Sequence, residues 1–170
     1  EVYESLAKIA PTVVTEGTGI NWKQDFLLIA AALGTTEKAE KLMEEYNTKA
    51  KSVGQKAGSE KTFSFLYTSA DRTRIFAKSS FVGSICADAS LARPATAQVE
   101  KTSIDLSSEQ LDQADGDYLF YGVQGGDESK LTGEALWSTL KAVTEKHAHS
   151  VDSDMFFLNA GPAAALGVLE

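Results

Sequence analysis

Residues 107–124 read S-S-E-Q-L-D-Q-A-D-G-D-Y-L-F-Y-G-V-Q, and this stretch combines a capped helix, a tight turn and the most apolar strand of the chain. Ser107 and Gln110 have the spacing of a capping box, which predicts that a short helix begins there. Residues 115–117 are typical of a turn, and residues 118–123 are β-prone and uncharged. Strands that are apolar on both faces are typical of parallel sheets covered by helices. The stretch therefore predicts an α/β fold.

The segments on either side add helices and further strands. Residues 36–57 keep apolar side chains at helical spacing, which predicts a helix of about 22 residues and roughly 33 Å. We predict further strands at residues 10–15, 62–68, 73–77, 98–102 and 148–151, and further helices that begin at Asn21, at Ser79 or Ser80, at Thr132 and at Pro162. This order predicts a three-layer α/β lobe with a central, mostly parallel sheet, preceded by a long connecting helix.

Composition and charge exclude some classes of partner. The chain has 170 residues and a net charge of -8, and its lysines and arginines are not clustered, which argues against a nucleic-acid surface. Cys86 is the only cysteine of the sequence, and its apolar neighbours predict a buried thiol. The sequence does not start with Met and stops within a helical pattern, so we expect an excised piece of a longer protein.

Motifs of common enzyme classes are missing from the sequence. There is no G-x-S-x-G, H-E-x-x-H or P-loop pattern, and Y-G-V-Q-G-G lacks the spacing of G-x-G-x-x-G. His147 and His149 alternate onto one strand face and could be metal ligands, but exposed strand-end histidines are the favoured interpretation. Asp115 and Asp117 could be a carboxylate pair, but carboxylates that flank a glycine are more often turn formers. We therefore expect no enzyme, with a subdomain of an α/β enzyme as the competing class.

Aromatic side chains favour a binding protein instead. Rings near the ends of strands and the starts of helices can cover an apolar or planar ligand. Four such rings are Phe81, Tyr121, Phe156 and Phe157. Core packing is an equally good interpretation of each ring taken alone. Arg72, Arg74 and Arg93 flank the predicted hairpin and could meet an anionic ligand, although each taken singly is better explained as a solvated surface side chain.

Seven segments, taken together, carry a resemblance to one protein family. They are, in order, S-L-A-K-I-A-P-T-V, W-K-Q-D-F-L-L-I-A-A-A-L-G-T-T-E-K-A-E-K-L-M-E-E-Y, S-S-F-V-G-S-I-C-A-D-A-S-L-A-R-P, L-S-S-E-Q-L, D-G-D-Y-L-F-Y, L-W-S-T-L-K-A-V and A-G-P-A-A-A. No segment is specific by itself, but their order and spacing over nearly the whole chain are. The chain resembles the solute-binding proteins that deliver iron-siderophore complexes, haem or cobalamin to ABC importers, and the siderophore branch is the most similar.

The resemblance implies a division of the chain and a way of binding. Residues 1–20 would be the tail of an amino-terminal lobe, residues 21–57 the connecting helices, and residues 58–170 the carboxy-terminal ligand-binding lobe. In this family, two α/β lobes clasp the ligand between them, and a long rigid helix limits their relative movement. The implied function is binding of a ferric siderophore for an ABC importer, with a haem or cobalamin carrier as the alternative.

The resemblance also implies contacts with the ligand. The matching positions are Arg74, Ser79, Ser80, Phe81, Tyr121, Gln124, Met155, Phe156 and Phe157. Relatives that take highly anionic catecholate complexes tend to have arginine where this chain has Ser80 and Gln124, so a neutral or mixed hydroxamate complex is expected. Tyr121 could instead be an axial ligand of haem. The siderophore's oxygens would hold the iron, so we expect no cofactor and no metal ligand in the protein.

Docking to a membrane permease is a further implied role. In the family, an acidic residue on each lobe meets arginines of the permease, and the motif S-x-E-x-L places Glu109 at that position. Glu109 could equally be present because a carboxylate favours the positive end of its helix. The resemblance implies an extracytoplasmic protein, in the periplasm or lipid-anchored at the outer face of the cell membrane. We expect a monomer without a nucleic-acid partner.

Overall fold

A five-stranded sheet forms the centre of the structure, a computed structural model that describes residues 2–17, 19–70 and 72–170. In spatial order the strands are β3 (Ser103–Leu106), β2 (Arg72–Phe76), β1 (Phe63–Ser69), β4 (Tyr118–Val123) and β5 (Ala148–Ser150). β1, β4 and β5 pair in parallel, whereas β2 is antiparallel to both β1 and β3. Four of the five strands therefore run in the same direction, and the predicted mostly parallel sheet is confirmed.

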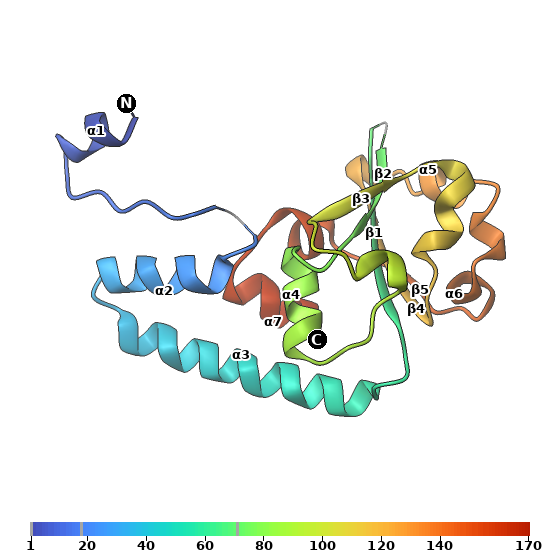
Figure 1. Cartoon of the computed structure of the whole chain (residues 1–170), viewed down its shortest axis with the longest axis horizontal. Coiled ribbons are helices and arrows are strands. Elements are labelled where there is room, and N and C mark those ends of the chain that lie inside the picture. Colours follow the sequence, from blue (N-terminus) through green and yellow to red (C-terminus); the bar gives the residue numbers. More distant parts are fainter. Residues whose placement is uncertain (1, 18, 71) are drawn as a thin grey trace.

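Helices lie before and after the strands (Figure 1). The α-helices are α1 (Val2–Ala7), α2 (Trp22–Ala32), α3 (Thr36–Ala57), α4 (Phe81–Asp88), α5 (Ser129–Thr132), α6 (Lys141–Thr144) and α7 (Pro162–Val168). The 3-10 segments are η1 (Ala95–Ala97), η2 (Ser108–Ala114), η3 (Gln124–Gly126) and η4 (Trp137–Thr139), and η5 (Asp154–Leu158) is π-helical. Within the described parts of the chain, none of the helices has the length and apolar character that crossing a membrane requires.

α3 is the long connecting helix that the sequence predicts. Its buried side chains recur at helical spacing and are those of Ala39, Met43, Tyr46 and Ala50. Gly58 follows the helix with a positive φ of 75°, a conformation that favours glycine. In Figure 1, α3 runs along the lower side of the molecule from α2 to the chain segment that enters β1. The Tyr46 hydroxyl donates to the Asp88 carboxylate of α4 (2.5 Å), so a polar contact joins the packing that fixes α3 to the lobe.

Two hydrophobic cores lie on opposite faces of the sheet, because successive strand residues alternate between the faces. The first core, on what we call the closed face, joins Leu66, Ile75 and Leu119 of the sheet to η2, α5, η4 and α6. The second, on what we call the aromatic face, joins Phe65 and Phe120 to α3, α4 and α7. The lobe therefore has three layers, with the sheet in the middle.

Two predicted strands are wrong. Residues 10–15 are irregular and mostly exposed, and in the described part of the chain the sheet contains no strand from this segment. Residues 98–102 are irregular as well, and the edge strand begins directly after them, at β3. β3 is the better strand because it places Ile104 and Leu106 against the closed-face core, whereas residues 98–102 offer only Val99 as a large apolar side chain.

The helix predicted over residues 132–143 is instead three short helices, α5, η4 and α6. α5 ends at Thr132, directly before Gly133, and the extended backbone of Leu140 (φ −61°, ψ 137°) interrupts the helical path. The Asp115 carboxylate accepts hydrogen bonds from the backbone N–H of Lys141 (2.5 Å) and of the next residue (3.1 Å). Because these are free donors at a helix start, Asp115 makes Lys141 the first residue of a new helix. The predicted turn residue Asp115 thus caps a helix that begins 26 residues later in the sequence.

Candidate functional site

A row of aromatic rings covers one face of the sheet. β1 presents Phe63, Phe65 and Tyr67 on this face, as their alternation in the sequence predicts. The ring of Phe63 stacks on Tyr118 of β4 (5.2 Å between centroids), and Phe65 stacks on Phe120 (5.4 Å). Parallel pairing in register between β1 and β4 brings these rings together.

Gly122 has no side chain, which leaves room for Ser153 and Phe157 at the end of this row. A Cβ on Gly122 would lie 2.5 Å from the Ser153 hydroxyl oxygen and 2.9 Å from the Phe157 ring. Because glycine leaves that space empty, Phe157 packs over the sheet against Tyr67 (5.3 Å between centroids) and Phe76 of β2 (5.1 Å). Phe157 therefore caps the carboxyl-end part of the aromatic face.

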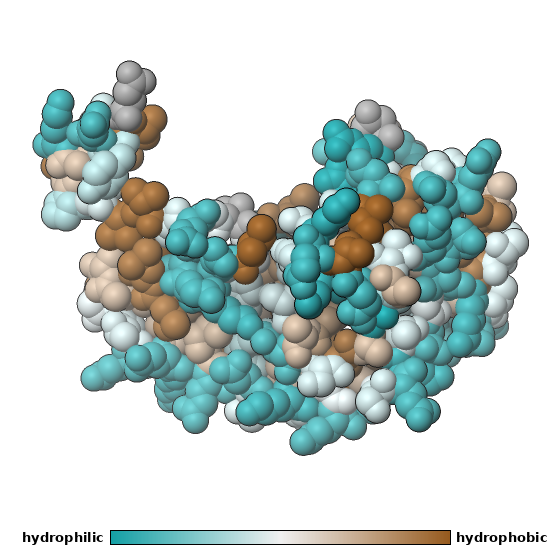
Figure 2. Space-filling view, viewed as in Figure 1, coloured by the Kyte–Doolittle hydropathy of each residue, from teal (hydrophilic) through white to brown (hydrophobic). Residues whose placement is uncertain are grey.

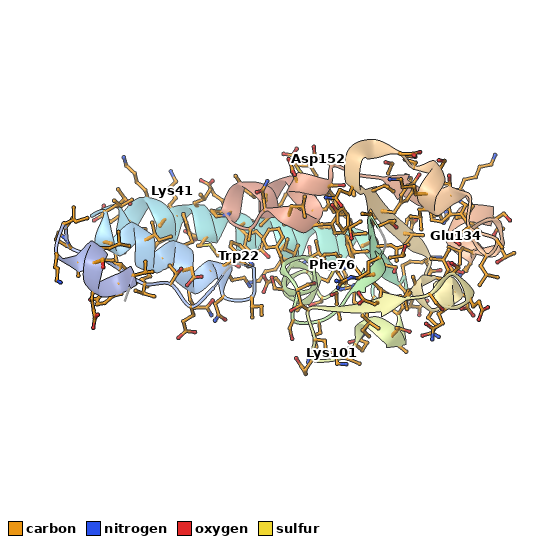
Figure 3. All side chains as sticks on the ribbon, turned by 90° about the horizontal axis from the view of Figure 1, so that it is seen from above. Trp22, Lys41, Phe76, Lys101, Glu134 and Asp152 are labelled. Carbon is orange, nitrogen blue, oxygen red and sulfur yellow. The ribbon has the colours of Figure 1, made fainter. Side chains whose placement is uncertain are left out.

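A hollow of about 130 Å³ lies beside this ring. Its walls come from Phe76, from residues 79–81 at the start of α4, from residues 157–160 and from Ile20 in the segment before α2. Figure 2 shows that the upper surface of the molecule dips between the N-terminal segment and the hairpin. Viewed from above in Figure 3, Phe76 lies near the middle of the molecule, and Trp22 of α2 lies further toward the N-terminal end. The hollow is thus bordered by the segment before α2 and by residues of the part of the chain that contains the sheet.

Ser79 and Ser80 both line the hollow, but they differ in what they can offer a ligand. The Ser80 hydroxyl donates to the Ala77 carbonyl (2.7 Å) and accepts from the Gly83 N–H (2.9 Å), so it caps α4 and is buried. Ser79 is half-buried, and its hydroxyl has a long contact of 3.4 Å to the Glu100 carboxylate. Ser79 is therefore the hydroxyl that a ligand can reach, while Ser80 fixes the helix start.

Phe81 forms the floor of the hollow next to the connecting helices. Its ring packs edge-on against Trp22 (5.6 Å between centroids). The Trp22 indole N–H donates to the Ser84 hydroxyl (3.0 Å), and the indole also meets the Tyr46 ring edge-on (5.2 Å). The floor of the hollow is thus continuous with the packing of α2 and α3.

The side chains of Met155, Phe156 and Phe157 lie in three different environments. Met155 packs under α7, where a Cβ on Gly167 would lie 2.4 Å from its sulfur. Phe156 points into the core, against one ring of β1 (6.3 Å between centroids) and one ring of β4 (6.2 Å). Phe157 lines the hollow, together with Leu158, which is 58% exposed. Of the three predicted residues, only Phe157 borders the hollow.

Arg74 and Gln124 do not line the hollow. Arg74 shares its strand face with Phe76, two residues further along β2, and its Nε lies 3.8 Å from the Asp105 carboxylate of β3. The Gln124 side-chain oxygen accepts from the backbone N–H of Ala70 (3.3 Å). Gln124 therefore ties the end of β4 to the end of the hairpin.

Tyr121 is on the other side of the sheet from Phe81 and Phe156, so these three rings, all predicted to contact the ligand, do not share one face. Alternate residues of β4 face opposite cores, and Tyr121 belongs to the closed face with Trp137 (4.9 Å between centroids). Its hydroxyl donates to Glu128 (3.0 Å). Burial and this carboxylate raise the pKa of Tyr121. In this position Tyr121 cannot be an axial ligand for haem in the hollow.

Glu109 is exposed on η2, at some distance from the aromatic face. The predicted capping contact is present beside it, since the Gln110 side-chain oxygen accepts from the Ser107 N–H (3.3 Å). A second hollow, of about 490 Å³, lies between this helix start and the hairpin and is lined in part by Ser107, Arg72 and Lys130. It is larger than the first hollow but contains none of the predicted ligand contacts, and its floor belongs to the closed face.

Arg93 is buried, so the interpretation as a solvated arginine is wrong. Its guanidinium donates to the backbone carbonyls of Phe63 (2.8 Å) and Phe76 (2.6 Å), one in each strand of the hairpin, and lies 5.1 Å from the centre of the Phe65 ring. Burial lowers the pKa of Arg93 and, beside it, raises the pKa of the buried Cys86 thiol. Arg93 holds the hairpin in place and is not placed to meet a ligand.

Asp117 directly precedes β4 and is surrounded by hydrogen-bond donors. It accepts from Lys141 Nζ (2.8 Å) and from the backbone N–H (2.8 Å) and hydroxyl (2.9 Å) of Thr62. These donors hold the pKa of Asp117 well below its usual value. Asp117 thus locks the start of β4 to the start of β1, and Asp117 and Asp115 are structural, as expected of turn residues.

Metal-ligand chemistry finds no support at the histidines. The His147 ring stacks on Tyr118 (4.6 Å between centroids), and its Nδ1 lies 3.1 Å from the Asp117 carbonyl oxygen. His149 is exposed. Among the described residues, there is no group of three or more His, Cys, Asp or Glu side chains that could hold a metal ion.

Three residues that the sequence analysis did not select belong to the site. Tyr67 and Phe76 pack against Phe157, and Leu158 is an exposed apolar wall of the hollow. The signal for Tyr67 was present, because it alternates with Phe63 and Phe65 along one predicted strand. The face of the sheet on which the Tyr67 ring lies could be assigned only once the register with β4 was known.

With the geometry in place, comparison with known proteins assigns the family. A family model described as "Periplasmic binding protein" matches residues 1–155. The chain belongs to the periplasmic binding protein family. Curated relatives of this periplasmic binding protein chain include the probable siderophore-binding lipoprotein YfiY of Bacillus subtilis, which is 31% identical over 187 residues that cover 99% of this chain and 57% of that protein. The iron(3+)-hydroxamate-binding protein FhuD of the same species is 30% identical over 179 residues, covering 98% of this chain and 56% of that protein.

The chain thus spans little more than half the length of these two relatives. Solved structures of similar fold include Staphylococcus aureus SirA complexed with staphyloferrin B, with a TM-score of 0.84 and 26% identity, covering 99% of this chain and 65% of that chain. FhuD2 of the same species with bound ferrioxamine B has a TM-score of 0.81 at 16% identity, covering 98% of this chain and 68% of that chain, and shows a shared fold. The periplasmic binding protein fold is therefore present over nearly the whole chain.

Proposed function

We propose that the complete protein is the substrate-binding component of an ABC importer and that it binds a ferric siderophore between two lobes. This chain would supply the carboxy-terminal lobe (residues 58–170), the connecting helices (residues 21–57) and the tail of the amino-terminal lobe (residues 1–20). The observation that carries the proposal is the open hollow at the end of the aromatic face, in a chain with siderophore-binding relatives.

The hollow offers contacts to the organic shell of an iron chelate, while the chelate's own oxygens hold the iron. Phe157 and Phe81 provide rings, Leu158 provides an exposed apolar surface, and Ser79 provides a reachable hydroxyl. Arg74 adds a cation next to the rings. Such a mixture of apolar and few polar groups is typical of ligand sites. We propose no catalytic step and no cofactor, since capture and release of the chelate suffice for transport.

The ligand class that fits these residues is a neutral or mixed hydroxamate chelate. Ser80 and Gln124 stand where an arginine would favour a highly anionic chelate, and both use their side chains for structural hydrogen bonds. Arg74 is opposed by the carboxylate of Asp105. The similarity to an iron(3+)-hydroxamate-binding protein supports the same class.

Transport requires an extracytoplasmic location and a permease, and we propose both. The protein would act as a monomer in the periplasm or lipid-anchored at the outer face of the cell membrane, with no nucleic-acid partner. Glu109 is exposed on η2, away from the ligand hollow, and would meet basic residues of the permease. Glu109→Ala in the full-length protein should lower siderophore uptake by cells without changing the affinity for the chelate. A fall in affinity would show that Glu109 is no docking residue.

Fluorescence titration of the full-length protein with a ferric hydroxamate tests the ligand directly. Trp22 lies against Phe81 at the floor of the hollow, so an iron chelate bound there should quench its emission. We expect saturable quenching by ferrichrome and much weaker quenching by iron-free ferrichrome at the same concentration. The absence of saturable binding of any ferric chelate would contradict the proposed function.

A further inference from the structure

Asp105 stands between two arginines at the edge of the sheet next to the hollow. Its carboxylate oxygens lie 3.7 Å from Arg72 Nη1 and 3.8 Å from Arg74 Nε. Asp105 and Arg74 are directly opposite each other in the antiparallel pair of β3 and β2, so their side chains share a face. On that face, Arg74 is followed two residues later by Phe76, which lines the hollow. The cluster therefore lies on the same strand face as one wall of the hollow, within the range of charge–charge interactions with a ligand bound there.

The cluster has one negative and two positive charges. Arg74 is 28% exposed on its side chain, and its buried Nε has no hydrogen-bond partner among the described residues. The distances of 3.7 and 3.8 Å are those of ion pairs without a short hydrogen bond, so Asp105 offsets the charge of Arg74 without using its donors. The field of Arg74 on a ligand is thus reduced.

A second cation near the hollow is neutralised in the same way. Lys78 precedes the hollow residue Ser79 and forms an ion pair with Glu100, and the Glu100 carboxylate also lies 3.4 Å from the Ser79 hydroxyl. Arg74 and Lys78, which both precede α4 in the sequence, therefore each have a carboxylate partner. This arrangement lowers the positive potential of the rim while it keeps hydrogen-bond donors in place.

We infer that Asp105 is a specificity-determining residue that makes this half of the cleft select neutral over polyanionic iron chelates, with Glu100 as a weaker second contributor. This inference rests on the proposed function, and it specifies the charge of the iron chelate that the site prefers. Three hydroxamates neutralise Fe³⁺, whereas three doubly ionised catecholates leave three negative charges on the chelate. Only the second kind of chelate gains from an uncompensated arginine, so removal of the carboxylate should favour it selectively.

The size of the effect follows from Coulomb's law. A unit charge that faces a trianionic chelate at about twice the usual ion-pair distance through water changes the affinity by roughly tenfold, because three charges act together. A neutral chelate has no net charge for this interaction. Salt should reduce the effect, because the Debye length is only about 10 Å at 0.1 M ionic strength.

The test compares two chelates on variants of the full-length protein. Binding of ferrichrome, a neutral trishydroxamate, and of ferri-bacillibactin, a triscatecholate, is measured by fluorescence quenching. We expect the unaltered protein to prefer ferrichrome, and Asp105→Asn to raise the ratio of ferri-bacillibactin to ferrichrome affinity by roughly tenfold at low salt. Glu100→Gln should raise the ratio by a smaller factor, because Glu100 is more exposed.

Two controls make the outcome decisive. Glu44→Gln removes the same charge from the exposed side of α3 and should leave the ratio unchanged. Arg74→Gln should move the ratio in the opposite direction to Asp105→Asn, which keeps the inference testable if the Asp105 variant does not fold. The inference is overturned if Asp105→Asn leaves the ratio within twofold, if Glu44→Gln raises it equally, or if the unaltered protein prefers ferri-bacillibactin. Failure of the unaltered protein to bind either chelate would instead overturn the proposed function.

Discussion

The two faces of the sheet are built from the same strands but end differently. On the closed face, Tyr121 is buried under Trp137 and its hydroxyl is bound to Glu128. On the aromatic face, the row of rings continues to Phe157, which borders an open hollow. One residue step along β4 therefore decides which face a ring joins, since Tyr121 belongs to the closed face and Phe120 to the aromatic face.

The cover of each face explains the difference. Short helices from residues 108–144 bury Leu119 and Leu131 on the closed face and leave the second hollow only at its border, between the start of η2 and the hairpin. The aromatic face is covered by α3, α4 and α7, which come from distant parts of the sequence, and the hollow remains where the start of α4 meets residues 157–160. Substitutions on the two faces should therefore have separable effects, on stability for one and on ligand affinity for the other.

The largest effect is expected at Leu119, which is fully buried on the closed face. Leu119→Ala should lower the free energy of unfolding by about 2–5 kcal/mol, because it removes buried methyl groups and leaves a cavity. Urea denaturation measures the loss, and the conservative Leu119→Ile should cost less than about 1.5 kcal/mol. Chelate affinity of the folded variant should not change. A clear change in affinity would contradict the separation of the faces.

On the aromatic face, Phe157→Ala should weaken binding of a ferric hydroxamate by roughly tenfold, because it removes a ring from the wall of the hollow. Met155→Ala is the matched control, since Met155 lies two residues away but packs under α7. Titration of both folded variants measures the effect. If Met155→Ala weakens binding as much as Phe157→Ala, the contacts assigned to this segment are wrong.

A smaller effect is expected from Tyr121→Phe. This substitution removes the hydrogen bond to Glu128 but keeps the ring, so the free energy of unfolding should fall by about 1 kcal/mol. Ligand affinity should stay constant, since the hydroxyl lies on the closed face. Loss of affinity in this variant would mean that Tyr121 reaches the ligand, and it would contradict the assignment of ligand binding to the aromatic face alone.

The smallest effect concerns acid. Because Lys141 and Thr62 hold the pKa of Asp117 below its usual value of 3.8, the folded state keeps this carboxylate ionised when the unfolded chain already binds a proton. The stabilisation is therefore fully present above about pH 4 and is lost as the pH falls below that value. Urea denaturation between pH 3 and pH 7 should show this loss, with a shallower decline in Asp117→Asn. Equal pH dependence in both proteins would contradict the assigned role.

Local patterns predicted much of the fold. The apolar stripe of residues 36–57 gave the bounds of α3, and the hydroxyl of Ser80 caps α4 as expected. Predictions failed where distant contacts decide. The helix over residues 132–143 is broken because Asp115, from another part of the chain, caps Lys141. The strand at residues 10–15 needs a partner that the described chain does not offer.

The site was harder to predict than the fold, because apolar residues on both faces of β4 hide which way each ring points. Tyr121 and Phe120 are equivalent in the sequence pattern, and only the register with β1 places Phe120 on the aromatic face. The role of Asp105 was also invisible, since it depends on pairing across β2 and β3. Capping signals in the sequence located the start of α4, and the family resemblance selected Ser79 and Phe81 there as ligand contacts.

Hydrogen–deuterium exchange of the full-length protein, with and without ferrichrome, tests most directly whether the end of the aromatic face is the binding half-site. The account predicts that backbone amides in residues 79–83 and 157–161 become protected when the chelate binds, while residues 119–121 and 129–132 are unaffected. Protection confined to the segments that cover the closed face, with no change around the hollow, would contradict it.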